Sequence, residues 1–365
     1  MRRTAFICDE SYFWHDAGSA ALVLPPGGYI QPDGSAESPE SKRRFKNLME
    51  RSGLYDKLTL IKPKPATEEQ LKYFHTERHI ENVKKLSAGG GGDCGVLANV
   101  GKGSYEIAVL AVGGAITAVE AVVSGKCDNV YALIRPPGHH ALPDMGMGYC
   151  IFNNAVIAAM YAKKELGIER IMIFDWDVHH GNGTEDAFYK DSSVLFISTH
   201  QESYFPPGRG EIGQTGEGEG EGYTINIPLP AASGDACYLY AVEQIIKPAC
   251  DKFKPQLIII SAGQDANIFD PSARMMMSAD GYKKMTKLIR DIAETHSGGK
   301  LVVLHEGGYS TPYVPFCSHA VVEEMSGFDS DVEDPFLPVF GTTPYNVLAP
   351  HQQARVDEIR KAHKL

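Results

Sequence analysis

From residue 129 onward, short apolar runs alternate with longer stretches that have helical spacing. The apolar runs have the length of buried strands and cover residues 130–134, 171–174, 194–198, 257–261 and 301–304. The helical stretches lie between them, at residues 154–166, 184–189, 235–253 and 279–295. Strands that take turns with helices form βαβ units. The pattern therefore predicts an α/β fold with a mostly parallel sheet and helices on both faces.

The bulk composition favours one large folded unit. Hydrophobic residues make up 43% of the 365 residues, which is enough for an extensive buried core. No repeat or linker interrupts the pattern, so we expect a single domain over residues 1–365. Its chemically active motifs should lie within residues 129–325, and a more polar extension follows at 326–365.

Charge and cysteine usage exclude several classes of protein. The formal net charge of −11 argues against direct nucleic-acid binding, although it permits a positively charged substrate. The seven cysteines include no C-x-x-C pair, which fits reduced thiols and not a disulfide framework. The chain has no run of about 18 apolar residues, and its N-terminal apolar run is too short for a signal peptide. We therefore expect a cytoplasmic protein that does not span a membrane.

The residues that follow the strands are of the types that perform chemistry. After the five apolar runs the chain reads, in order, RPPGHHALPDMGMGYC, DWDVHHGNG, THQESYFPPG, AGQDAN and HEGGYS. In parallel α/β sheets, ligands bind at the carboxyl ends of the strands. These five segments should therefore meet at one edge of the sheet and form a single site.

The segment after residues 171–174 predicts a metal site. Asp175, Asp177 and His179 occupy alternate positions, so an extended chain would place them on one face. A buried strand that ends in carboxylates is unfavourable unless a cation binds there. Solvated loop residues with a capping histidine are the alternative. Asp265 can supply a third ligand, which leaves an open position for a catalytic Zn²⁺, Fe²⁺ or Co²⁺.

Two adjacent histidines follow the first of the five strands. His139 and His140 lie where a metal-activated water would need a base, although such a pair is often incidental. Asp175 would orient one imidazole and raise its basicity, and Asn182 would hold the other without adding charge.

Three aromatic residues complete the predicted chemistry. Tyr309, after two glycines, can donate a hydrogen bond to a developing oxyanion. Tyr149 and Phe205 can wall a narrow channel, although core packing is an alternative for each of the three. Together with the metal and the histidines, this set suits hydrolysis of an amide on a slim, extended chain.

The motifs RPPGHHA, MGYCIFNN, DWDVHHGNGT, the SAGxDA-type turn and EGGYS resemble the metal-dependent histone deacetylase family. The class II and bacterial deacetylase-like amidohydrolase branch is the most similar, and the likeness covers residues 4 to 325. The resemblance implies the arginase–deacetylase fold, a three-layer α/β/α arrangement around a mostly parallel eight-stranded sheet.

The resemblance also implies a role for each matching residue. Asp177, His179 and Asp265 match the zinc ligands, and His140 matches the general base and acid. His139 matches its electrostatic partner, and Tyr309 matches the carbonyl-polarising tyrosine. The residues that match the substrate channel are Tyr149, Phe205, Gly148 and Ser272.

The family also has two sites for K⁺ or Na⁺, which the resemblance maps onto this chain. The first corresponds to Asp175 and Ser198 with the carbonyls of Asp177, His179 and Thr199. The second corresponds to Phe188, Asp191, Val194 and Tyr223.

The chain departs from the family pattern at a few positions. Gln264 replaces the usual aromatic residue before the third metal ligand, which puts the polarity or packing of the site in question. Ser272 stands where polyamine-preferring relatives carry a glutamate. Asn182 stands where class I members carry an aspartate, and Tyr149 replaces the more common phenylalanine.

We expect zinc-dependent hydrolysis of N-acetyl-lysine in a protein or peptide. The first alternative is an amidohydrolase for small acylated amines such as acetylpolyamines. The second is an acyl-lysine-binding protein with poor turnover, which Gln264 leaves open. Bacterial relatives suggest a homo-oligomer, either a dimer or a tetramer.

Overall fold

The computed structural model describes residues 2–22 and 24–365, and its centre is one eight-stranded sheet. The strand order is β12-β11-β10-β13-β14-β8-β1-β4, and every neighbouring pair is parallel. The predicted parallel α/β sheet is therefore confirmed. The strands span Thr4–Ile7 (β1), Thr59–Ile61 (β4), Asn129–Ala132 (β8), Ile171–Asp175 (β10), Val194–Gln201 (β11), Thr224–Leu229 (β12), Leu257–Ala262 (β13) and Leu301–His305 (β14).

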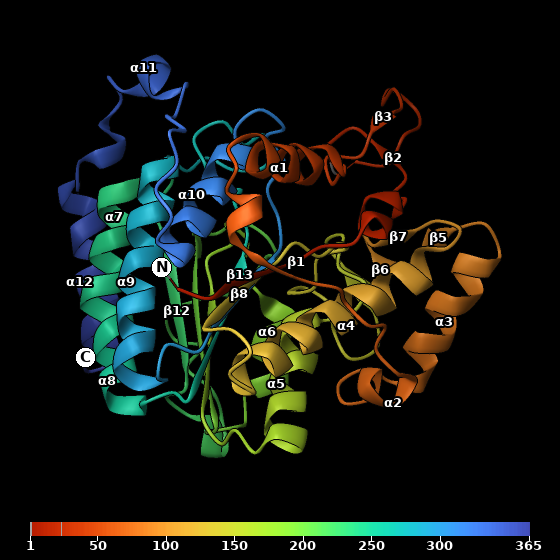
Figure 1. Ribbon diagram of the computed structural model, residues 1–365, viewed down its shortest axis with the longest axis horizontal. Helices are drawn as coiled ribbons and strands as arrows, with labels where there is room; N and C mark the ends of the chain where they lie inside the picture. Colours follow the sequence, from red (N-terminus) through yellow and green to blue (C-terminus); the bar gives the residue numbers. More distant parts are fainter. Residues whose placement is uncertain (1, 23) are drawn as a thin grey trace.

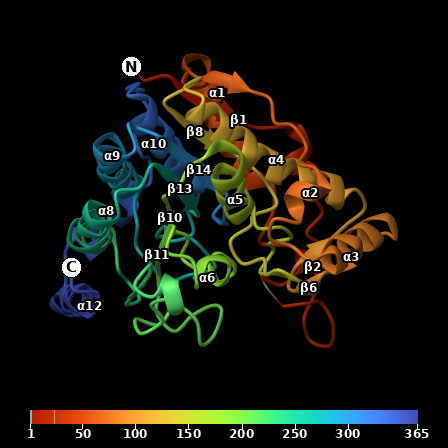
Figure 2. The ribbon, with the colours of Figure 1, turned by 90° about the horizontal axis from the view of Figure 1, so that it is seen from below.

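Helices cover both faces of the sheet and make three layers (Figures 1 and 2). One face carries Glu40–Arg51 (α1), Asp235–Ala241 (α7), Lys247–Phe253 (α8), Ala279–His296 (α9), Val314–Ser326 (α10) and Pro350–Ala362 (α12). The other face carries Ser104–Val123 (α4), Asn154–Leu166 (α5) and Asn182–Phe188 (α6). Outside α4 lie Glu68–Leu71 (α2) and Glu77–Ala88 (α3), and the C-terminal region adds Leu337–Phe340 (α11).

The central strand shows why the sheet is buried on both sides. In β10, Met172 and Phe174 belong to the core beneath α7 to α10, whereas Ile171 and Ile173 belong to the core beneath α4 and α5. Successive side chains of a strand point to opposite faces, so an apolar strand of this kind needs a helix layer on each face.

Helix α4 is the one helix in the described ranges that is long and apolar enough to cross a membrane. Of its most apolar window, 72% is buried inside the protein. Gly113 lies so close to residues 64–66 that a Cβ would be 1.7 Å from the carbonyl oxygen of Lys64. Burial and close packing of this kind are typical of a helix in a protein core.

Several element boundaries differ from those predicted. The sequence pattern did not identify β12, β11 continues to Gln201, and α6 begins at Asn182 instead of residue 184. Residues 18–40 are rich in glycine, proline and serine, a composition that predicts a long loop, and they contain the short antiparallel pair Ser19–Ala20 (β2) and Asp33–Gly34 (β3). That prediction also covers Val23, which lies outside the described residues. Further short strands are Gly92–Asp93 (β5), Gly95–Val96 (β6), Asn99–Val100 (β7) and Gly146–Met147 (β9).

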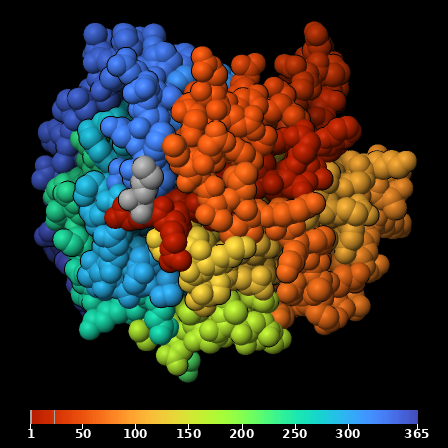
Figure 3. Space-filling model, viewed as in Figure 1, coloured from red at the N-terminus to blue at the C-terminus, as the bar shows by residue number. Residues whose placement is uncertain are grey.

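The N-terminal segment spreads over one side of the molecule, seen as red and orange in Figure 3. It enters the sheet as β1, leaves it for the β2–β3 segment, and returns as α1. The segment therefore contributes both to the sheet and to the surroundings of its carboxyl edge.

Candidate active site

The site is formed at the carboxyl edge of the sheet. Strands β11, β10, β13, β14 and β8 are consecutive in the strand order and run in the same direction. Because this is the ligand-binding edge of a parallel α/β sheet, the segments after these strands are brought together there. The structure thus brings the five segments that follow these strands together at one edge of the sheet.

The three side chains predicted to bind a metal converge just beyond β10 and β13. Nδ1 of His179 lies 3.0 Å from Oδ1 of Asp177 and 3.1 Å from Oδ2 of Asp265. Both carboxylates are fully buried, and the side chain of His179 is 12% exposed. One donor atom from each residue lies within 4.8 Å of the others, a separation that permits a shared metal ion.

The backbone reaches this arrangement through a bend. Strand β10 ends at Asp175, and residues 176–181 leave the sheet before α6 begins. The expected extended row of side chains is therefore wrong after Asp175. The side chains still meet, because the amide of Asp177 donates to Oδ1 of Asp175 (3.1 Å) and the amide of His179 donates to Oδ1 of Asp177 (2.9 Å).

Two glycines leave room for the carboxylates. A Cβ on Gly263 would lie 2.1 Å from Oδ2 of Asp177, and a Cβ on Gly307 would lie 2.4 Å from Oδ2 of Asp265. The amide of Gly307 also donates to Oδ2 of Asp177 at 2.9 Å. The backbone thus approaches the carboxylates more closely than any residue with a side chain would allow.

Burial and neighbouring charges shift the pKa values of all three donors. Burial and the charge of Asp177 raise the pKa of Asp265 to about 7. Burial also opposes ionisation of Asp177, but the charges of His139 and His179 outweigh it and hold its pKa below the ordinary range. Burial lowers the pKa of His179, yet its hydrogen bonds to both carboxylates raise it well above the ordinary value. A divalent ion at this position would replace the proton as the balancing charge.

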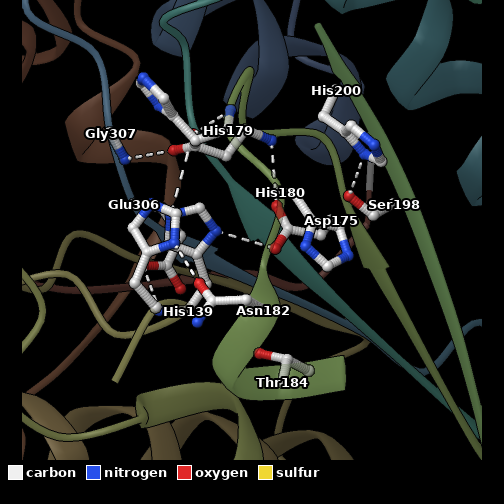
Figure 4. Close-up of polar contacts among 12 residues, drawn as sticks. His139, Asp175, His179, His180, Asn182, Thr184, Ser198, His200, Glu306 and Gly307 are labelled. Atoms are coloured by element: carbon white, nitrogen blue, oxygen red, sulfur yellow. Dashed lines mark hydrogen bonds and ion pairs between the residues drawn. The ribbon is translucent and has the colours of Figure 1, made fainter. Parts of the chain in front are cut away.

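The two adjacent histidines have different partners, and Figure 4 shows the first of them, His139, beside Asp175. Nδ1 of His139 lies 2.9 Å from Oδ2 of Asp175, and Nδ1 of His140 lies 2.8 Å from Oδ1 of Asn182. The two ring centroids are 3.9 Å apart. The irregular turn that the sequence required for two neighbouring side chains to face one site is present, since residues 136–141 belong to no helix or strand.

The histidines also differ in charge. Burial disfavours protonation of His139, but the charges of Asp175 and Asp177 outweigh burial and raise its pKa to about 10. Burial, aided by the charge of His139, lowers the pKa of His140 well below the ordinary value. These surroundings therefore favour the protonated form of His139 and the neutral form of His140, which can accept a proton.

Glu306 is a site residue that the sequence reasoning missed. Its buried Oε2 accepts hydrogen bonds from the amides of Gly138 (2.6 Å) and His139 (3.3 Å), and thereby fixes the turn that carries the histidines. Burial raises the pKa of this carboxyl to about 7. Its position directly after β14, in the segment HEGGYS that also contains Tyr309, could have identified this acid as a site residue.

A cavity of about 250 Å³ leads to the donors and the histidines. Its lining includes every residue that the resemblance placed in the channel, together with three that the sequence did not identify: Leu22, Leu97 and Tyr204. Tyr204 stacks on His179 with ring centroids 5.7 Å apart, and its hydroxyl donates to the carbonyl oxygen of Ser272. The channel wall is therefore predominantly aromatic and aliphatic.

Tyr309 lies beside this channel with its hydroxyl toward the carboxylates. A Cβ on Gly307 would lie 3.1 Å from the hydroxyl of Tyr309 and 2.4 Å from Oδ2 of Asp265. The hydroxyl and the carboxylate oxygen therefore lie close to the same position beside Gly307. The amide of Tyr309 donates to Oδ2 of buried Asp270 at 2.8 Å, which anchors the loop. The ring centroid of Tyr149 is 5.8 Å from that of Tyr309.

Gln264 lies behind the donors and is fully buried. Its backbone amide donates to the carbonyl oxygen of Gly307 at 3.0 Å. Within residues 2–22 and 24–365, neither polar atom of its side chain has a hydrogen-bond partner. The residue thus supports the loop before Tyr309 through its backbone, and its side chain does not reach the donors by a hydrogen bond.

The residues matched to the first monovalent-cation site lie along β10 and β11. Ser198 is in register with Asp175, and Oγ1 of Thr199 donates to the carbonyl oxygen of Asp175 at 3.4 Å. Oγ of Ser198 lies 2.9 Å from Nδ1 of His200. Cation binding by this group stays a prediction.

The residues matched to the second monovalent-cation site lie at the start of β11. The amide of Asp191 donates to the carbonyl oxygen of Phe188 at 3.0 Å, and its carboxylate pairs with Lys163 at 2.5 Å. The carbonyl oxygen of Tyr223 accepts from Phe196, two residues beyond Val194 in the same strand. Cation binding here likewise stays a prediction.

A comparison with models of protein families assigns the chain to a known family. The family model of the histone deacetylase domain matches residues 35–325. The chain belongs to the histone deacetylase family. The family resemblance drawn from the five motifs is thereby confirmed.

Curated members of the histone deacetylase family include close relatives of this chain. It is 50% identical over 337 residues to a histone deacetylase-like amidohydrolase of Pseudomonas aeruginosa, and the match covers 92% of this chain and 89% of the relative. It is 39% identical to a probable deacetylase of Archaeoglobus fulgidus, with 85% and 88% covered. The crystal structure of the HDA15 HD domain superposes with a TM-score of 0.86 at 29% identity and covers 99% of this chain and 94% of that one. These matches confirm the fold and support a hydrolase of the deacetylase or amidohydrolase type.

Proposed function

We propose that this member of the histone deacetylase family hydrolyses N-acetyl-lysine side chains with a zinc ion held by Asp177, His179 and Asp265. The observation that carries the proposal is the pair of buried histidines, held through their Nδ1 atoms by Asp175 and Asn182, at the foot of an aromatic channel that ends at the three donors. Two carboxylates and one imidazole leave coordination positions open for substrate. Fe²⁺ and Co²⁺ also suit this oxygen-rich set.

When bound, the ion would polarise the substrate carbonyl and make a water molecule more acidic. Nδ1 of His140 donates to Asn182, so its Nε2 takes the proton of the attacking water and later gives it to the leaving amine. The charges of Asp175 and Asp177 favour the protonated form of His139, and its charge would stabilise the negative transition state. The hydroxyl of Tyr309 donates to the carbonyl oxygen as charge develops there.

The channel suits the stem of an acylated lysine. Among the described residues, no aspartate, glutamate, lysine or arginine lines the cavity, and its walls include Tyr149, Phe205 and Leu22. A methylene chain can pack against such walls without losing solvation of a charged group. An acetylpolyamine carries a further ammonium, and Ser272 offers it no carboxylate.

Hydrolysis of small acylated amines is the second candidate. The relative from Pseudomonas aeruginosa is named an amidohydrolase, which covers both substrate classes. A binding protein with poor turnover is the third candidate. The complete set of donors, histidines and Tyr309 favours catalysis, and the Gln264 side chain makes no hydrogen bond to them within residues 2–22 and 24–365.

Further properties follow from the same family membership. We propose one deacetylase domain over residues 1–365, with residues 326–365 as an extension that packs through α12 beside β12 and α7. We also propose structural K⁺ or Na⁺ at the two sites described above, a cytoplasmic location without direct nucleic-acid or membrane binding, and assembly into a dimer or tetramer.

Substrate choice is tested by measuring turnover of an acetyl-lysine peptide and of N-acetylputrescine by the zinc-loaded protein. We expect a higher kcat/KM for the peptide, because the described channel residues offer no counter-charge to the free ammonium of the polyamine. Equal or better use of N-acetylputrescine would assign the protein to the small-amine candidate. Tight peptide binding without release of acetate would assign it to the binding candidate.

A further inference from the structure

A buried cluster of three charged side chains lies behind the active site. Glu37, Lys42 and Arg135 are 0%, 1% and 1% exposed. They join three segments that are far apart in the sequence: the N-terminal segment with Glu37, the start of α1 with Lys42, and the end of the β8 segment with Arg135. Arg135 directly precedes the turn that carries His139 and His140.

Arg135 alone neutralises Glu37. Its Nη2 lies 2.8 Å from Oε2 of Glu37, and its Nε donates to Oε1 at 3.0 Å. Its Nη1 donates to the carbonyl oxygens of Tyr12 (3.0 Å) and His15 (2.7 Å), and its Nη2 also donates to the carbonyl oxygen of Glu37 (2.9 Å). The guanidinium is thus fully engaged, and the pair with Glu37 carries no net charge.

Lys42 adds a second positive charge that this pair does not need. Its Nζ lies 3.0 Å from Oε1 of Glu37, but among the described residues it completes no hydrogen bond. The neighbouring His305 does not compensate it, since burial and the charge of Lys42 lower the pKa of His305 to about 3 and leave it neutral. A buried surplus charge is costly unless it interacts with negative or electron-rich groups.

The electron-rich group next to Lys42 is the phenol ring of Tyr309. Nζ of Lys42 lies 5.5 Å from the ring centroid, within the range of a cation–π contact. The neighbouring residue Ser41 donates from Oγ to the carbonyl oxygen of Gly308 at 2.9 Å, which fixes α1 to the loop of Tyr309. In Figure 1, α1 lies beside α10, the helix that begins at Val314, shortly after Tyr309.

We propose that Lys42 is a positioning residue that acts through Tyr309, and this inference rests on the proposed function. As the phenol O–H is drawn toward the developing oxyanion, negative charge accumulates on the phenol, and the ammonium of Lys42 stabilises that charge. The stabilisation is larger in the transition state than in the substrate complex, so it acts on kcat and not on KM.

The test removes the charge of Lys42 in two separate variants, Lys42→Met and Lys42→Gln. Either change leaves the neutral pair of Glu37 and Arg135 intact, and Lys42→Gln retains a polar group at this position. We expect kcat for an acetyl-lysine peptide to fall about tenfold in both variants, with KM unchanged, as for loss of one desolvated cation–π contact. Lys46→Met is the matched control, because Lys46 lies one turn further along α1 and 5.7 Å from the ring of Tyr55, away from the site.

A double-mutant cycle shows whether Lys42 acts through Tyr309. In a Tyr309→Phe background, we expect Lys42→Met to cause no further loss of kcat. An equal loss in both backgrounds, or a change confined to KM, would overturn the inference.

A readout that does not depend on turnover separates this inference from the proposed function. In protein labelled with 3-fluorotyrosine, the ¹⁹F resonance that disappears in Tyr309→Phe belongs to Tyr309. We expect this resonance to shift in Lys42→Met and Lys42→Gln but not in Lys46→Met. An inactive wild-type protein would refute the proposed function, whereas an unshifted resonance would refute the role of Lys42 even in an active enzyme.

Discussion

Replacing Tyr309 with phenylalanine is expected to lower kcat about a hundredfold or more while the protein stays folded. The variant removes one hydroxyl at the edge of the channel and retains the ring that packs 5.8 Å from Tyr149. The hydroxyl lies beside the carboxylate cluster, where the substrate carbonyl would gain negative charge. Its loss therefore acts on the transition state more than on substrate binding. Steady-state kinetics with an acetyl-lysine peptide measure the effect.

Tyr149→Phe is the matched comparison for this prediction. It removes a hydroxyl from the same channel, but that hydroxyl donates to the carbonyl oxygen of Leu22 at 3.1 Å. We expect Tyr149→Phe to change KM and to leave kcat close to that of the wild type. Similar kcat values for wild type and Tyr309→Phe would show that the tyrosine is not a catalytic residue.

Replacing Glu37 with glutamine is expected to lower the free energy of unfolding by about 3–5 kcal/mol, as when one partner of a buried ion pair is removed. Arg135 and Lys42 would then remain buried without a counter-charge. Denaturant unfolding at neutral pH measures the loss. Glu40→Gln is the control, because the side chain of Glu40 is 50% exposed and its contact with Arg43 is long at 3.7 Å. Its expected loss is below about 1 kcal/mol.

The loss caused by Glu37→Gln should depend on pH in one direction. Burial alone would raise the pKa of Glu37, but the charges of Arg135 and Lys42 outweigh it and lower the pKa from 4.5 to about 2. The contribution of the carboxylate is therefore present in full above about pH 4.5 and declines as pH falls toward 2. The difference in free energy of unfolding between wild type and Glu37→Gln should be constant from neutral pH down to about pH 4.5 and should then shrink at lower pH. A difference that grows in acid would contradict the assignment.

The sequence predicted those parts of the fold that follow from local pattern. Apolar runs of strand length, separated by helices, led directly to a parallel sheet, and the rule for strand ends then brought Asp177, Asp265 and Tyr309 to one edge. Strand β12 was not predicted because TINIPL follows a glycine-rich segment and alternates with polar residues. Only its pairing with β11 makes it a strand.

The parts that could not be predicted depend on contacts distant in the sequence. Glu37 and Arg135 are 98 residues apart, and neither lies in a pattern that indicates the other. Leu22 and Leu97 line the channel, and both have positive φ values. Leucine rarely adopts this backbone conformation, so the sequence does not indicate it. Glu306 was overlooked because its partners are backbone amides of the histidine turn, and backbone partners leave no trace in side-chain spacing.

The central claim is that turnover requires one divalent ion held by Asp177, His179 and Asp265. The most direct measurement is to strip the protein with a chelator, add Zn²⁺ in increments, and follow hydrolysis of an acetyl-lysine peptide. We predict that stripped protein is inactive and that activity rises to a plateau at one equivalent of zinc per chain, whereas Asp265→Asn gives little activity at any of these concentrations. Full activity in the stripped protein, or zinc-restored activity in Asp265→Asn equal to that of the wild type, would contradict the account.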